Sequence, residues 1–152
     1  MNYIEVKSTL YQNCLDWIDQ KISITSKAVK DAQDSANNEE KSSAGDKYET
    51  GRAMSQNQRD MYAKQLAECN KQKQLLLAID STKSNERISN GSLVLTDNAN
   101  YFISISAGAF VVEDKTYFAV SSETPVAILL HSKTVGDQFL LNGKNIKINS
   151  IL

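Results

Sequence analysis

Proline, glycine and histidine are scarce in this sequence. The 152 residues include one proline, six glycines and one histidine, and the glycines and the proline all lie at or beyond Gly45. With one histidine and two widely separated cysteines, Cys14 and Cys69, the chain shows no set of zinc ligands and no Cys-His dyad. We therefore do not expect a self-sufficient hydrolase. The two thiols are interpreted as small buried residues.

A charge excess and a long hydrophobic run are also missing. The chain has 17 lysines and arginines against 18 acids, a net charge of −1. This balance argues against a protein that holds nucleic acid by a bulk positive field, so any nucleic-acid partner must come by another route. No stretch approaches about 18 consecutive apolar residues, and residues 1–7 lack the profile of an export signal. We expect a cytoplasmic protein with no membrane partner.

Helical periodicity fills the first half of the chain. From Asn2 to Asp34 apolar residues recur at spacings of four and three, which predicts a helix of about 30 residues. A small, polar stretch at 35–45 predicts a turn, and good helix formers return from Asp46 to Asp80. Two such helices are expected to pack as an antiparallel hairpin, a coiled coil over residues 1–80. The first helix carries one expected seam at Ile4, Tyr11, Leu15, Ile18, Ile22, Val29 and Ala32 and a second set at Leu10, Cys14, Trp17, Ile24 and Ala28, and the second helix carries Met54, Met61, Tyr62, Leu66, Cys69, Leu75, Leu76 and Ile79.

The second half of the chain is predicted to be a small β domain. After a linker at 81–90, short β-prone runs alternate with turn residues over 91–152. Thr124 suits the N-cap of a short helix and Pro125 its first position. The fold class is therefore α+β, a helical hairpin followed by a small antiparallel sheet with one short helix. The expected strands contain Leu93–Leu95, Tyr101–Ile105, Phe110–Val112, Thr116–Val120, Phe139–Leu141 and Ile146–Ile148.

The pentapeptide Gly45–Glu49 carries the strongest candidate for chemistry. Its two acids, Asp46 and Glu49, stand three residues apart at the predicted start of the second helix. In a structural interpretation, Asp46 caps the helix and Glu49 completes a pair resembling a capping box. In a functional interpretation, both carboxylates point outward from the end of the long helical hairpin, and such oxygen ligands suit Mg²⁺. Two acids alone do not make a tight metal site, but they can complete one that a partner supplies.

Two segments of the chain resemble the bacterial GreA/GreB transcript-cleavage factors. The first is the Gly-Asp-x-x-Glu motif at Gly45–Glu49 on a helical hairpin. The second is Glu123–Ala127, followed by Leu130, Lys133 and the Val-Gly-Asp at 135–137. Both segments occur in the order of that family, so the resemblance covers nearly the whole chain. The chain departs from the family at Thr50–Arg52, after the first motif, and at Ile128, where an arginine is usual.

The resemblance implies a definite function. Members of the family bind RNA polymerase at the rim of its secondary channel through an FKBP-like C-terminal domain and insert the hairpin toward the active centre. Asp46 and Glu49 match the acids that help hold the second catalytic Mg²⁺, which is shared with the polymerase, and orient the attacking water. The polymerase itself then cuts the backtracked RNA. Glu123, Thr124 and Pro125 match the segment that contacts the channel rim.

The resemblance also implies an accessory factor, not an enzyme, with no cofactor of its own, and we expect a monomer. Near the acids, Lys47, Arg52 and Arg59 are candidates to steady the RNA 3′ end, although solvated helix charges are an alternative interpretation. Three other functions stay open. These are a regulator that occupies the same channel without promoting cleavage, a peptidyl-prolyl isomerase, and a coiled-coil adaptor with a β-domain head.

Overall fold

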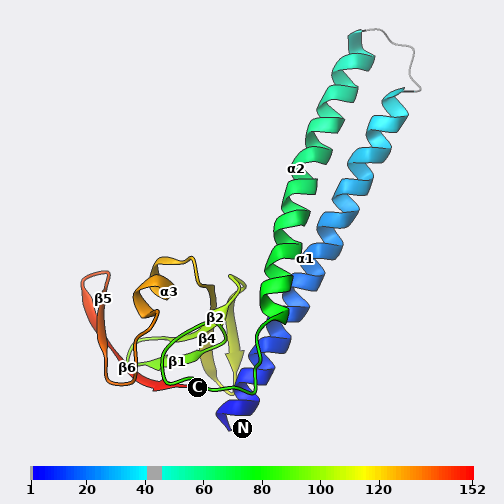
Figure 1. The fold of residues 1–152 in the computed structure, drawn as a ribbon. Helices are drawn as coiled ribbons and strands as arrows, with labels where there is room; N and C mark the ends of the chain where they lie inside the picture. The colour runs from blue at the N-terminus through cyan, green and yellow to red at the C-terminus, as the bar shows by residue number, and fades with distance from the viewer. Residues whose placement is uncertain (1, 41–45) are drawn as a thin grey trace. The chain divides into compact units, whose positions relative to one another are not determined.

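The computed structural model describes residues 2–40 and 46–152, and the side chains of 2–38 and 50–152 among them (Figure 1). Its first half is two long helices that pack together, and its second half is a six-stranded sheet with a short helix. The elements are α1 (Tyr3–Glu40), α2 (Asp46–Leu77), β1 (Leu93–Thr96), β2 (Asn100–Ser104), β3 (Gly108–Val112), β4 (Lys115–Ser121), α3 (Pro125–Leu130), β5 (Gln138–Leu141) and β6 (Lys144–Ile151).

Helix α1 is longer than its sequence predicted. The predicted turn began at Ser35, but α1 continues to Glu40, so the residues from Ser35 to Glu40 are helical. The reason lies in Ala36, which is 1% exposed and continues the buried stripe that contains Ala32. Burial of this stripe outweighs the modest helix propensity of the neighbouring serine and asparagines. Helix α2 begins at Asp46 as predicted and includes Gly51.

The chain forms two compact units. One contains residues 18–73, the greater part of the two helices. The other contains the residues up to Trp17 together with Gln74–Leu152, and thus the whole sheet and α3. The domain limits at 80 and 90 stay a prediction. None of the described helices is long and apolar enough to cross a membrane.

In the unit of residues 18–73, α1 buries the seam that its periodicity predicted. Ile18, Thr25, Ala32 and Ala36 are buried, with half-buried Ile22 and Val29 between them. The facing stripe of α2 contains Arg59, Tyr62, Leu66 and Cys69, again at spacings of three and four. An ion pair of 2.7 Å between Lys73 Nζ and Asp19 Oδ1 joins the two helices.

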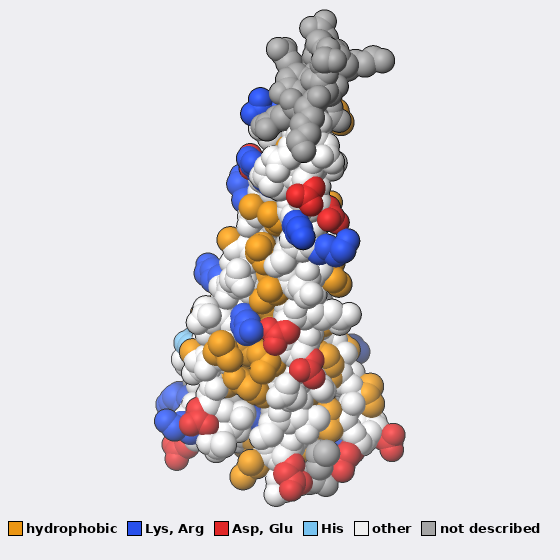
Figure 2. All heavy atoms as spheres, turned by 90° about the vertical axis from the view of Figure 1, so that its right-hand side faces the viewer, with side chains coloured by type: hydrophobic (Ala, Val, Ile, Leu, Met, Phe, Trp, Pro, Cys, Tyr) orange, Lys and Arg blue, Asp and Glu red, His pale blue; other side chains and the backbone are white. Residues whose placement is uncertain are grey.

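Five predicted packing positions are wrong because they lie beside the buried stripes, namely Ile4, Ile24, Met54, Met61 and Leu75. Ile24, Met54, Met61 and Leu75 are 63%, 61%, 46% and 52% exposed, since each comes one position before a buried or half-buried residue and is therefore turned by about 100° around its helix. Ile4, in the other unit, is exposed because Val6, Leu10 and Cys14 form the buried stripe of the first turns of α1. Figure 2 shows hydrophobic side chains that reach the surface along the helices.

The six predicted β runs all form strands, in the order β3-β4-β2-β1-β6-β5. The prediction of a wholly antiparallel sheet is wrong in one place, because β2 and β4 are parallel. The chain passes from β2 to the edge strand β3, and then turns back through Glu113 and Asp114. Both turn residues have positive φ, 50° and 65°, as a tight hairpin requires. Strand β4 therefore lies between β3 and β2 and runs in the direction of β2.

The sheet is buried on both faces at β2. Tyr101 and Ile103 belong to the cluster that packs against α3. The alternate residues, Phe102 and Ser104, point to the opposite face, where the Oγ of Ser104 lies 3.7 Å from the Sγ of Cys14 on α1. The cluster on the α3 side contains Ile88, Val94, Tyr101, Ile103, Ala127, Leu130, Phe139, Ile146 and Ile148.

Lys7 ties three segments of this unit together. Its side chain is buried, and its Nζ donates hydrogen bonds to the backbone oxygens of Lys83, after α2, and Leu152, after β6. Burial lowers the pKa of Lys7, while the Asp80 carboxylate acts in the opposite direction. The predicted linker is also anchored, because the backbone of Ile88 exchanges hydrogen bonds with Lys133 and Ser132.

Burial raises the pKa of the Cys14 thiol to about 11 from its usual 9.0, although the hydrogen bond with Ser104 acts in the opposite direction. The unfolded chain therefore loses this proton first as the pH rises. We predict that the neutral, buried Cys14 thiol stabilises the folded protein fully below pH 9.0. This stabilisation should disappear as the pH rises from 9.0 to about 11. The loss is at most about 3 kcal/mol. Urea unfolding across this range should show a steeper fall for the parent than for Cys14→Ala. Parallel pH profiles for the two proteins would contradict the prediction.

Candidate functional site

The two acids of the first motif lie in the first turns of α2. Asp46 is the first residue of this helix and Glu49 the fourth, so the backbone begins the helix where the motif predicted. The side chains of Asp46, Lys47 and Glu49 lie outside the described residues. The capping and Mg²⁺-binding interpretations of Asp46 and Glu49 therefore both stay predictions, as does the contact of Lys47 with RNA.

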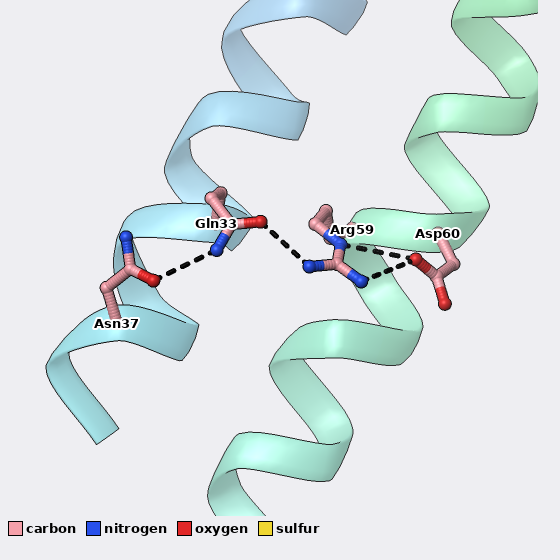
Figure 3. Close-up of polar contacts among 4 residues, drawn as sticks. All are labelled: Gln33, Asn37, Arg59 and Asp60. Carbon is pink, nitrogen blue, oxygen red and sulfur yellow. Dashed lines mark hydrogen bonds and ion pairs between the residues drawn. The ribbon is translucent and has the colours of Figure 1, made fainter. Parts of the chain in front are cut away.

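Arg59 is engaged by two neighbours within the hairpin (Figure 3). Its Nη1 donates a hydrogen bond of 2.8 Å to the Oε1 of Gln33 on α1. Its Nε and Nη2 donate to the Oδ1 of Asp60, at 3.2 and 3.0 Å. The side chain is 32% exposed, so Arg59 is not a freely solvated helix charge. Arg52 lies two turns nearer the start of α2 and is half-buried. For both arginines, contact with RNA stays a prediction.

The second motif forms the start of α3, and its predicted capping is confirmed. Thr124 is the N-cap, with an extended backbone at φ −70° and ψ 151°, and Pro125 follows it as the first helical residue. The Thr124 hydroxyl accepts a hydrogen bond of 3.4 Å from the backbone N–H of Ala127. The same hydroxyl donates one of 2.8 Å to the Ser121 carbonyl oxygen. This double contact fixes the direction in which the six-residue helix leaves β4.

Helix α3 divides into a buried and an exposed face. Ala127 and Leu130 are buried against the sheet, and their spacing of three marks the inner face. The outer face has an acidic end and an apolar middle. We call it the α3 face, and it contains Glu123, Pro125, Ile128 and Leu129.

Sequence reasoning missed Ile128 as a functional candidate and noted it only as a departure from a family pattern. Its side chain is 63% exposed, although it stands in an apolar run. The signal was present in the sequence, because a helix that buries positions 127 and 130 must turn position 128 outward. Leu129 beside it is 37% exposed, so two aliphatic side chains reach the surface of this short, capped helix.

A cleft of about 290 Å³ lies beside Lys7, lined also by Leu75, Ile79, Asp80 and Gly91. Two hydrogen bonds from Thr82 lower the pKa of Asp80, and Lys83 and Lys7 contribute further. The ionised Asp80 and the Lys7 ammonium thus serve contacts within the chain. Within the described residues, no group of three or more histidine, cysteine, aspartate and glutamate side chains could hold a metal ion. Comparison with protein-family models, with curated proteins and with solved structures found no match to this chain.

We predict that Thr124→Ala lowers the free energy of unfolding by about 1 kcal/mol, because the variant loses the cap of α3. The variant Thr124→Ser keeps the hydroxyl and should retain most of the stability. Urea unfolding curves of the three proteins test this prediction. It fails if Thr124→Ala unfolds at the same urea concentration as the parent.

Proposed function

We propose that this chain is an accessory factor that binds bacterial RNA polymerase at the rim of its secondary channel and stimulates the cleavage of backtracked RNA by the polymerase. One observation carries the proposal. Helices α1 and α2 pack together, and α2 begins at Asp46, so both acids of the Gly-Asp-x-x-Glu motif fall in its first turns. A 32-residue helix such as α2 measures about 48 Å, a length that suits a probe for a deep channel.

The positions of Asp46 and Glu49 in α2 suit a shared metal site. Residues three apart lie on one side of a helix, so a single cation can reach both carboxylates. Mg²⁺ commonly takes one or two carboxylates and completes its shell with water and phosphate. When bound between the two proteins, such an ion would stabilise the attacking and leaving oxygens of phosphoryl transfer. Asp46 and Glu49 would contribute oxygen ligands and accept a hydrogen bond from the attacking water.

The α3 face is the proposed docking surface on the polymerase. It offers Pro125 and Ile128 as an apolar contact, with the Glu123 carboxylate at its edge for a basic group. Thr124 supports this surface through its cap. We further propose that residues 91–152 form an FKBP-like domain, since the six-stranded sheet and short helix are compatible with that fold.

The near-neutral charge of the chain agrees with an accessory role. With a net charge of −1, the protein has little bulk field to attract RNA. In the proposed complex the polymerase supplies both the nucleic-acid binding and the remaining metal ligands. The protein then needs only to dock and to deliver two carboxylates, and no catalytic activity of its own.

We predict that backtracked elongation complexes shorten their RNA faster in the presence of this protein. Asp46→Asn and Glu49→Gln should each abolish the acceleration, because a neutral amide is a much weaker Mg²⁺ ligand. Both variants should still bind polymerase, which a pull-down with purified polymerase measures. If the parent binds while cleavage stays at the intrinsic rate, the protein is a binding-only regulator of the same channel.

We predict that Ile128→Asp weakens binding to polymerase at least about tenfold, because it places a charge in the apolar contact of the α3 face. Leu140→Asp is the matched control, since Leu140 on β5 has nearly the same exposure, 66% against 63%. Titration of labelled protein with polymerase gives the two affinities. Equal affinities for both variants would remove α3 from the docking surface.

A further inference from the structure

The part of the hairpin toward the start of α2 has few large side chains in its seam. Beyond Val29, the buried residues of α1 are alanines, Ala32 and Ala36. On α2, Met54 and Met61 point outward and Tyr62 is half-buried. Alanines bury little apolar area and fit many alternative positions of a facing helix. Apolar packing alone therefore leaves the register of α1 against α2 weakly fixed here.

A polar network crosses the two helices in this part (Figure 3). Gln33 accepts the hydrogen bond of Arg59 through Oε1 and donates one of 3.0 Å through Nε2 to the Oδ1 of Asn37, one turn along α1. On α2, Asp60 holds the other side of the guanidinium. Both partners of the helix-to-helix bond are thus held in place by a neighbour on their own helix. The planar guanidinium also offers its donors in a fixed geometry.

This network specifies one register. A slip of one turn would move the Gln33 oxygen by about 5.4 Å along the axis and leave the guanidinium of Arg59 without its acceptor on α1. The ion pair between Asp19 and Lys73 belongs to the same register. Gln33 comes after Asp19 on α1 by the same number of residues as Arg59 comes before Lys73 on α2, as the two contacts of one antiparallel hairpin must. A polar residue in a helical seam can set the register of its partner helix in this way.

We propose that the Gln33–Arg59 hydrogen bond locks the register of the hairpin, and that Arg59 is a positioning residue for Asp46 and Glu49. Helix α2 is continuous from Asp46 through Arg59, so a slip at Arg59 moves the start of α2 by the same distance against α1. The lock itself stands on the contacts in this chain, whereas its effect on cleavage rests on the proposed function. Arg59 then acts through the two acids and does not contact RNA.

The register is tested first in the full chain without polymerase. Nitroxide labels on Lys30→Cys and Lys71→Cys, both exposed positions, report the position of α1 along α2, while the native thiols are buried. Lys71 lies about nine residues, roughly 13 Å, along the hairpin from the residue that faces Lys30, so a slip along the axis changes the distance between the labels. We expect one narrow distance for the parent and a second population, displaced by about 5 Å, for Arg59→Met and for Gln33→Leu. Lys27→Met is the matched control, because Lys27 pairs with Asp31 within α1. An unchanged single distance for Arg59→Met would overturn the lock, and circular dichroism verifies that each variant is helical.

Cleavage tests the positioning role. At saturating protein, Arg59→Met and Gln33→Leu should lower the rate of RNA shortening by about tenfold or more and raise the Mg²⁺ concentration that gives the half-maximal rate. The protein concentration for half-maximal effect should not change, because docking does not use this network. Arg59→Lys keeps the charge but loses the planar fork, so it should behave as Arg59→Met does.

Other results would overturn either the positioning role of Arg59 or the proposed function in RNA cleavage. Full activity of Arg59→Lys together with full activity of Gln33→Leu would mean that the charge of Arg59 contacts RNA, and would overturn positioning. A shifted register with unchanged cleavage would overturn it as well. If the parent protein does not stimulate RNA cleavage, the proposed function fails. The distances between the nitroxide labels then remain as the test of the register lock.

Discussion

The packing of α1 against α2 is the interaction on which the rest of this protein depends. Its seam repeats at spacings of four and three from Ile18 to Ala36, and the helix that it packs against is the one that begins at Asp46. The seam changes character along its length, from isoleucine to alanine. Apolar burial stabilises one part, whereas a polar contact between Gln33 and Arg59 specifies the other. The proposed register lock therefore uses other residues than the apolar seam that stabilises the hairpin.

The unit with the sheet shows a second division of roles. Both faces of β2 are buried, one against α3 and the other toward the first turns of α1. Lys7 joins α1 to the ends of two other segments, so the helix and the sheet of this unit are connected by hydrogen bonds as well as by apolar burial. The outer face of α3 points away from this core, since Ala127 and Leu130 are its buried residues. Ile128 on that outer face is exposed, and we propose this face as the contact with a partner.

The sequence predicted local structure well and pairing poorly, for a physical reason. The six β runs, the cap at Thr124 and the start of α2 follow from neighbouring residues, so they could be read from short windows. The end of α1 and the parallel pairing of β2 with β4 depend on contacts between distant segments. The same holds for Arg59, whose partner Gln33 becomes its neighbour only in one register of the hairpin. Asp46 and Glu49 could be named as candidates from their spacing, but the role proposed for them depends on another macromolecule.

We propose above all that the carboxylates of Asp46 and Glu49 join a magnesium ion that belongs to RNA polymerase. The most direct measurement is the Mg²⁺ dependence of RNA shortening in purified backtracked complexes, with and without saturating protein. Two added oxygen ligands should strengthen the binding of that ion, so the protein should lower the Mg²⁺ concentration at which cleavage is half-maximal. The double variant Asp46→Asn/Glu49→Gln should leave that concentration where it stands without protein. An identical Mg²⁺ requirement with the parent protein and without it would contradict the claim.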